Sequence, residues 1–111
     1  MQIAGRCILL LVEDAQTAAH LVSDLERARA DLVVAAHSFE AIERLRKFTF
    51  AAAVIDYRRG GQERKGVAVM LAERGIPLLV LAEDRPPEHL GGTVVNSREG
   101  IVPALASLLA Q

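Results

Sequence analysis

Three carboxylate side chains follow short apolar runs at two places in this 111-residue sequence. Glu13 and Asp14 come directly after the run 7–12, and Asp56 comes directly after the run 51–55. A run of this length with no polar residue before its end indicates a strand that is buried on both faces. Each acid would then leave the core where a strand ends, which is the edge where sites form in open parallel α/β sheets.

If the two strands are neighbours, the three carboxylates share one pocket. Like charges at short range repel each other unless a cation lies among them. Carboxylates suit Mg²⁺, which is commonly held by one or two of them together with waters and a phosphoryl oxygen. A carboxylate beside such an ion can be the nucleophile that accepts a phosphoryl group. We therefore predict a Mg²⁺ site at Glu13, Asp14 and Asp56, with Asp56 as the reactive residue.

The acid pair Glu13 and Asp14 also has a simpler interpretation. An acidic residue at the start of a helix complements the helix dipole, and Asp14 or Thr17 could cap the helix that follows. That interpretation explains Asp14, but it does not explain three acids at two strand ends. Both interpretations stay open at the level of sequence.

The rest of the pattern predicts the elements that position these acids. Strands alternate with helices, which indicates a parallel sheet covered on both faces. We expect one domain over residues 1–111, an α/β flavodoxin-like doubly wound five-stranded parallel sheet of order 2-1-3-4-5, in which the first and third strands are neighbours. The expected strands are 7–12, 32–36, 51–56, 78–81 and 93–95, and the expected helices are 17–30, 38–48, 67–74 and 101–110.

The spacing of apolar residues predicts the buried face of two helices. In the first, the apolar residues with helical spacing are Leu21, Val22, Leu25 and Ala28. In the second, Ser38 is the expected N-cap. The apolar stripe expected to pack in the core from this second helix consists of Phe39, Ile42, Leu45 and Phe48.

Two polar segments are expected to be loops. The segment 57–66 contains glycines and four cations, which indicates an exposed loop. The segment 83–92 contains two prolines and two glycines, so we expect a loop or at most one helical turn there. A helix between the fourth and fifth strands is therefore expected to be reduced or absent.

Composition narrows the classes of partner. Thirteen basic and fourteen acidic residues, with no long run of either, give no electrostatic footprint for nucleic acid. No apolar run approaches the ~20 residues that span a bilayer, and the chain start lacks the order of a signal peptide. The charge and the run lengths therefore predict neither a nucleic acid nor a membrane as partner. The single Cys7 cannot form an internal disulfide, so we expect a reducing cytoplasm.

The acids and their setting resemble the receiver domain of bacterial two-component response regulators over nearly the whole chain. The resemblance is carried by Glu13-Asp14 and Asp56 after apolar strands, by Gly66 before the third helix, and by Pro77 at the entry to the fourth strand. It implies that Asp56 accepts a phosphoryl group from a sensor histidine kinase or a histidine phosphotransfer protein.

The resemblance also implies the ligands and the mode of signalling. Asp14 and Asp56 would bind Mg²⁺, with Glu13 acting partly through water and the backbone carbonyl of Arg58 as a further ligand. Output would come through contact with an unknown output protein, and a homodimer is another candidate assembly. Such a protein is not an enzyme beyond self-phosphorylation and autodephosphorylation at Asp56.

Two positions depart from the family pattern and make this chain atypical. The family carries Thr or Ser at the end of the fourth strand, where this chain has Ala82, and Lys at the end of the fifth strand, where it has Asn96. Neither replacement supplies the missing hydroxyl or positive charge. Cations of the segment after Asp56 could compensate, although a solvated loop is the simpler interpretation; they are Arg58, Arg59, Arg64 and Lys65.

Three functions are therefore weighed. The first is a receiver that is phosphorylated on Asp56, and the second is a pseudo-receiver, a protein-interaction module that is not phosphorylated. The third is a small enzyme or nucleotide-binding protein on the same fold. A dinucleotide site needs a glycine-rich turn after the first strand. Glu13 and Asp14 would repel a pyrophosphate there, which disfavours the third function.

Overall fold

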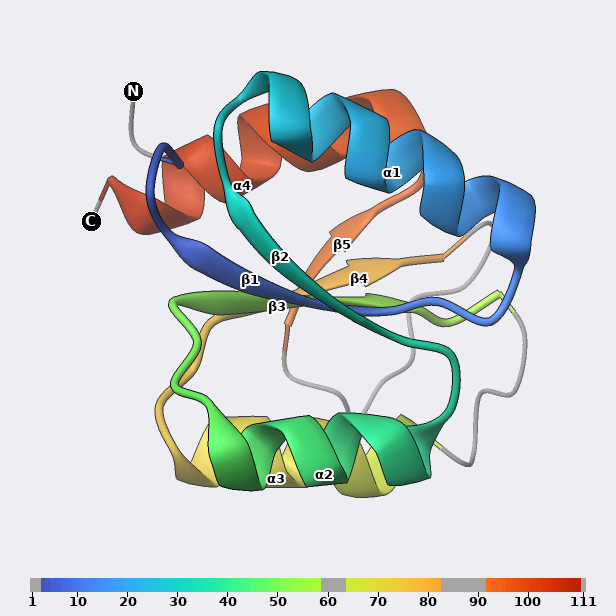
Figure 1. Ribbon diagram of the computed structural model, residues 1–111, viewed down its shortest axis with the longest axis vertical. Helices are drawn as coiled ribbons and strands as arrows, with labels where there is room; N and C mark the ends of the chain where they lie inside the picture. Colours follow the sequence, from blue (N-terminus) through green and yellow to red (C-terminus); the bar gives the residue numbers. More distant parts are fainter. Residues whose placement is uncertain (1–2, 59–63, 83–91, 111) are drawn as a thin grey trace.

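The computed structural model describes residues 3–58, 64–82 and 92–110. Within these residues, five parallel strands form one sheet of order β2-β1-β3-β4-β5 (Figure 1). The predicted strand order is confirmed, and the strand bounds differ from the prediction by one residue at most. The strands are β1 Cys7–Leu11, β2 Asp31–Ala35, β3 Ala52–Asp56, β4 Leu78–Leu81 and β5 Thr93–Val95.

Helices cover both faces of this sheet, which confirms the doubly wound α/β class. α1 and α4 lie on one face, and α2 and α3 lie on the other (Figure 1). The expected loss of a helix between β4 and β5 concerns residues that are almost all outside the described part of the chain. The α-helices are α1 Ala15–Arg27, α2 Ser38–Lys47, α3 Lys65–Glu73 and α4 Ile101–Leu109, the last preceded by a 3-10 turn at Arg98–Gly100.

Strand β3 is buried along its whole length, as its apolar run predicts. Successive side chains of a strand point to opposite faces. Val54 accordingly packs in the core under α1 and α4, whereas Ala53 and Ile55 pack in the core under α2 and α3. Because neither face of β3 meets water, its carboxylate can lie only at the end of the strand, as Asp56 does.

The apolar face of the first helix follows the prediction, although α1 starts two residues earlier and ends three residues earlier than the predicted range 17–30. Leu21, Leu25 and Ala28 are buried, and Val22 packs against the same core. Within the described residues, no helix has the length and the apolar character needed to cross a membrane.

The predicted apolar stripe of α2 is right at Ile42 and Leu45, which pack in the core under α2 and α3, and wrong at its two ends. Phe39 is 73% exposed and Phe48 is 49% exposed, whereas the buried residues of this helix are Ser38, Ala41 and Leu45. Ser38 is the first helical residue, with His37 at the cap position, so the expected N-cap is also one residue out. A spacing of three residues loses about 60° per step on a helix of 3.6 residues per turn, so a stripe with this spacing cannot stay on one face.

The third helix starts earlier than expected. α3 begins at Lys65, so Gly66 lies inside the helix rather than before it. Lys65 and Gly66, which were expected at the end of the loop 57–66, therefore belong to the helix. Its residues 59–63 lie outside the described part of the chain.

Gly92 precedes β5 at a point where this strand approaches β4 closely. A Cβ atom on Gly92 would lie 2.7 Å from the carbonyl oxygen of Leu78 and 2.9 Å from its Cγ atom. Because backbone atoms cannot move aside cheaply, we expect Gly92→Ala to lower the free energy of unfolding by about 1–3 kcal/mol in chemical denaturation.

Gly66→Ala is the matched control, because a Cβ atom at this helical position meets nothing within 4 Å. This substitution should be neutral or should stabilise the protein by up to about 1 kcal/mol. If Gly92→Ala unfolds at the same denaturant concentration as the wild type, the close approach of β5 to β4 is contradicted.

Candidate functional site

The parallel register brings the predicted acids to one edge of the sheet. Leu11 of β1 pairs with Ile55 of β3, so the residues that follow both strands leave the sheet at the same edge. Asp56 is buried, with 3% of its surface exposed, whereas Glu13 is exposed and Asp14 is half-buried. The prediction that the three acids share an edge of the sheet agrees with this register.

Arg58 binds the carboxylate of Asp56 with both its side chain and its backbone. The Nε atom of Arg58 donates to Oδ1 of Asp56 at 2.9 Å, and a terminal nitrogen donates to Oδ2 at 3.0 Å. The backbone N–H of Arg58 also donates to Oδ1, at 3.1 Å. Two parallel bonds from one guanidinium to one carboxylate are among the strongest hydrogen-bond arrangements in proteins. This ion pair neutralises Asp56 within the chain itself.

Asp14 caps α1, as one of the two sequence interpretations proposed. Its Oδ2 atom accepts from the backbone N–H of Thr17 at 2.9 Å and from the Thr17 hydroxyl at 2.6 Å. A terminal nitrogen of Arg58 donates to the same Thr17 hydroxyl at 3.1 Å. A continuous hydrogen-bonded chain therefore joins Asp56, Arg58, Thr17 and Asp14.

Glu13 also faces an arginine. A terminal nitrogen of Arg64 lies 3.6 Å from Oε2 of Glu13. The Arg64 side chain is only 3% exposed, so the expectation of a solvated loop is wrong at this residue. Lys65 is exposed and begins α3, and Arg59 lies outside the described residues.

In this structure protein groups, rather than a metal ion, engage the three acids. Among the described residues, no group of three or more His, Cys, Asp or Glu side chains is placed to hold one. Arginines supply positive charge to Asp56 and Glu13 instead, and Asp14 is engaged as a helix cap. Mg²⁺ coordination by Glu13, Asp14, Asp56 and the carbonyl of Arg58 therefore stays a prediction.

The two atypical positions lie where the sequence places them, after β4 and β5. Ala82 is buried and its backbone N–H donates to the carbonyl of Val95 at 3.0 Å. Its methyl group offers no hydrogen bond. Asn96 directly follows β5 and is exposed. Neither residue adds a charge to this edge of the sheet.

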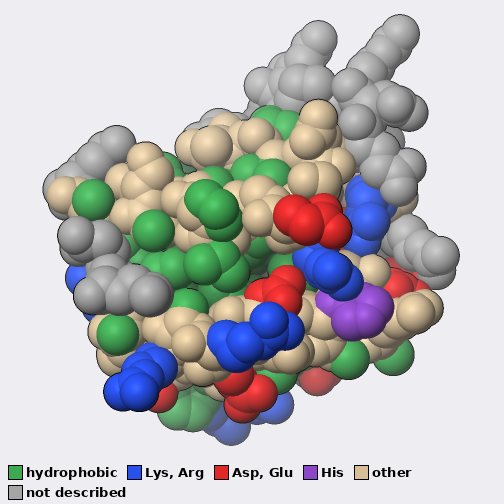
Figure 2. Space-filling view, turned by 90° about the horizontal axis from the view of Figure 1, so that it is seen from above, with side chains coloured by type: hydrophobic (Ala, Val, Ile, Leu, Met, Phe, Trp, Pro, Cys, Tyr) green, Lys and Arg blue, Asp and Glu red, His purple; other side chains and the backbone are tan. Residues whose placement is uncertain are grey.

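A cleft of about 330 Å³ opens beside Arg58, and sequence reasoning missed part of its lining. His20 and Arg98 belong to it, and the Nε atom of Arg98 lies 3.6 Å from Oδ2 of Asp24 on α1. Figure 2 shows the face formed by α1 and α4, on which acidic and basic side chains alternate beside a histidine. The sequence feature that could have pointed to Arg98 is its position shortly after β5, at the same edge of the sheet. The residues that line the cleft are Thr17, His20, Arg58, Arg98 and Glu99.

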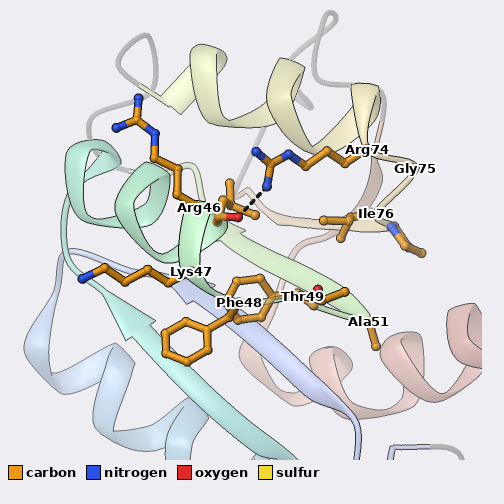
Figure 3. Close-up of a pocket in the computed structure, with 11 residues that line it drawn as sticks. Arg46, Lys47, Phe48, Thr49, Ala51, Arg74, Gly75 and Ile76 are labelled. Atoms are coloured by element: carbon orange, nitrogen blue, oxygen red, sulfur yellow. Dashed lines mark hydrogen bonds between the residues drawn. The ribbon is translucent and has the colours of Figure 1, made fainter.

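A second cleft, of about 320 Å³, lies at the opposite edge, where β3 and β4 begin (Figure 3). The rings of Phe48 and Phe50 lie 6.3 Å apart there, and Arg74 donates to the backbone carbonyl of Leu45. Cations at these helix ends complement the negative ends of the helix dipoles. Among the described residues, no carboxylate lines this cleft. Its arginine and lysine side chains are therefore explained by the helix ends and not by an acidic partner.

Cys7 opens β1, at the edge of the sheet away from Asp56. Burial raises the pKa of its thiol, and the charge of Asp31 raises this pKa further. Asp31 is the residue opposite Cys7 in the pairing of β1 with β2. A raised pKa lowers the thiolate fraction at neutral pH, so Cys7 is a weak nucleophile suited to packing.

No family model matches this chain, and no curated protein matches it. Solved structures do match. The receiver domain of a sensor histidine kinase from Pseudomonas aeruginosa, solved with a magnesium ion coordinated in its active-site cleft, is 14% identical with a TM-score of 0.83, and the match covers 97% of this chain and 100% of that chain.

Two response regulators give similar matches. SdrG from Pseudomonas melonis, in its BeF3-activated conformation, is 26% identical with a TM-score of 0.76, covering 96% of this chain and 98% of that chain. The chemotaxis response regulator CheY4 of Vibrio cholerae is 18% identical with a TM-score of 0.77, covering 95% of this chain and 99% of that chain. These three neighbours are receiver domains and response regulators, and this chain has their fold.

Proposed function

We propose that this chain is a signalling module of the receiver type, in which Asp56 accepts a phosphoryl group and output occurs by protein contact. The observation that carries the proposal is the position of Asp56. It is a buried carboxylate at the end of the central strand, on the edge to which Glu13 and Asp14 also lead, in a fold shared with receiver domains.

The residues of the chain suggest how Asp56 would react. The backbone N–H of Arg58 holds Oδ1, which fixes the orientation of the carboxylate. A carboxylate oxygen held in this way can attack phosphorus and form an acyl phosphate while the donor's leaving group departs. The Mg²⁺ prediction at Glu13, Asp14 and Asp56 belongs to this proposal, and the magnesium-bound neighbour supports it by analogy.

The proposed partners follow from this chemistry. A sensor histidine kinase or a histidine phosphotransfer protein would supply the phosphoryl group, and an unknown protein or a second copy of the chain would receive the signal. The chain would act in the cytoplasm, with no enzymatic activity beyond self-phosphorylation and autodephosphorylation at Asp56.

A pseudo-receiver is the second candidate, because one observation favours it. The Asp56 carboxylate is bound by the Arg58 guanidinium, and Ala82 offers no hydroxyl to a phosphoryl group. A carboxylate neutralised in this way can serve the fold without reacting. Under this reading the chain is an interaction module whose acids are structural.

Treatment with acetyl phosphate and MgCl₂ separates the two candidates. We expect intact-mass spectrometry to show the gain of one phosphoryl group in the wild type and no gain in Asp56→Asn. Asp31→Asn is the matched control, because Asp31 is an exposed acid at the opposite edge of the sheet, and it should behave as the wild type does. A wild-type protein that gains no mass at saturating MgCl₂ would rule out phosphorylation and leave the pseudo-receiver.

A further inference from the structure

We infer that Arg58 is the resident counter-ion of Asp56, and that a divalent cation reaches this carboxylate only in competition with the Arg58 guanidinium. That Arg58 and a divalent cation compete for the Asp56 carboxylate is inferred from the contacts of Asp56 alone. The consequence of this competition for phosphoryl uptake rests on the function proposed above. Arg58 is in this way a built-in regulator of the site.

The first support is the burial of the pair. The Asp56 side chain is 4% exposed, and the Arg58 side chain that covers it is 27% exposed. A buried carboxylate needs a cation or strong donors, since an unpaired charge in this position is expensive. The guanidinium meets both carboxylate oxygens, so an ion that binds the same oxygens must displace it.

The second support is the anchoring of the guanidinium on α1. Arg58 binds Asp56 and also donates to the Thr17 hydroxyl, which donates to Asp14, so protein groups link Asp56 and Asp14, two of the predicted metal ligands. Removing the Arg58 side chain from Asp56 breaks three hydrogen bonds at once, two to Asp56 and one to Thr17. The cleft beside Arg58 provides space for the displaced side chain.

The third support is the chemistry of the two cations. A guanidinium stays charged at every pH that the protein tolerates and matches a carboxylate in shape, so it competes constantly. Mg²⁺ gives up its waters reluctantly and demands a regular geometry. The wild type should therefore bind Mg²⁺ weakly, and loss of the guanidinium should strengthen the binding.

Calorimetric titration with MgCl₂ alone tests this inference. We expect Arg58→Ala and Arg58→Gln to bind Mg²⁺ about tenfold more tightly than the wild type or better, because the local cation that opposes binding is gone. Two variants are used so that one remains if the other fails to fold. Arg58→Gln keeps most of the length of the side chain without its charge.

Arg46→Ala is the matched control. It also removes one arginine charge, but Arg46 is an exposed residue beside the cleft at the opposite edge of the sheet (Figure 3). Its effect on Mg²⁺ affinity should stay within about twofold, because charges farther apart than a Debye length are largely screened. Equal tightening in Arg46→Ala and the Arg58 variants would overturn the inference, since it would show a general effect of net charge.

A second readout locates the event. Tyr57 is the single tyrosine of a chain without tryptophan, and it lies between Asp56 and Arg58. Its fluorescence should respond to MgCl₂ at lower concentrations in Arg58→Gln than in the wild type. If no variant binds Mg²⁺ more tightly than the wild type, or if none binds it at all, the inference fails.

The same samples separate this inference from the proposed function. Acetyl phosphate labelling of each variant at saturating MgCl₂ reports phosphoryl uptake by a readout separate from the Mg²⁺ titration. Tighter Mg²⁺ binding without labelling in any variant upholds Arg58 as the counter-ion and rejects phosphorylation. Labelling of the wild type with unchanged Mg²⁺ affinity in the Arg58 variants upholds phosphorylation and rejects the counter-ion.

Discussion

Arg58→Ala is expected to lower the free energy of unfolding by about 1–3 kcal/mol, the range for leaving a buried charged group without its partner. The substitution leaves the carboxylate of Asp56, which is 4% exposed, without the guanidinium that binds both its oxygens. The estimate lies below the full value for a completely buried pair because the Arg58 side chain is 27% exposed and partly screened by water. Urea denaturation monitored by circular dichroism measures the change.

Asp56→Asn is expected to have a smaller effect, of about 1 kcal/mol or less. The amide keeps the shape of the carboxylate and can still accept from the Arg58 backbone. The guanidinium left behind already borders an open cleft and can turn towards water. The expected asymmetry between the two partners follows from their different burial.

The double variant completes the cycle. Residues in direct contact usually show an interaction energy of about 0.5–3 kcal/mol, and this pair should fall within that range. An interaction energy near zero would contradict the ion pair. A cost of Asp56→Asn as large as that of Arg58→Ala would contradict the asymmetry in burial.

Most of the fold could be predicted because its signals are local and strong. The apolar run before Asp56 indicates a strand with no solvent face, and β3 is such a strand. Strands of this kind, alternating with helices, leave few topologies other than a doubly wound parallel sheet. That topology alone then takes Glu13, Asp14 and Asp56 to the same edge.

The partners of these acids could not be predicted in the same way. Arg64 lies in a polar stretch that reads as exposed, and its burial against Glu13 depends on where α3 begins. The bond from Arg58 to Thr17 joins residues 41 positions apart. Arg98 reaches the cleft from the turn after β5, so its place depends on tertiary structure. The sequence pattern identifies the carboxylates, but only the tertiary packing shows which arginines lie beside them.

For α2, the sequence predicted the wrong residues at the two ends of the apolar face. The observed burial of this helix gives the prediction with the largest expected effect. Leu45→Ala should lower the free energy of unfolding by about 2–5 kcal/mol, because Leu45 is 2% exposed and its truncation leaves a cavity in the core under α2 and α3. Phe39→Ala should change it by less than about 0.5 kcal/mol, because Phe39 is 73% exposed.

The two substitutions form an informative pair because the three-residue stripe would bury both side chains. Under that stripe, Phe39→Ala would remove the larger apolar group and would cost about 3–5 kcal/mol. Thermal and urea denaturation of both variants therefore decide how α2 is rotated about its axis. A loss of more than about 2 kcal/mol in Phe39→Ala would return this side chain to the core and would contradict the helix face formed by Ser38, Ala41 and Leu45.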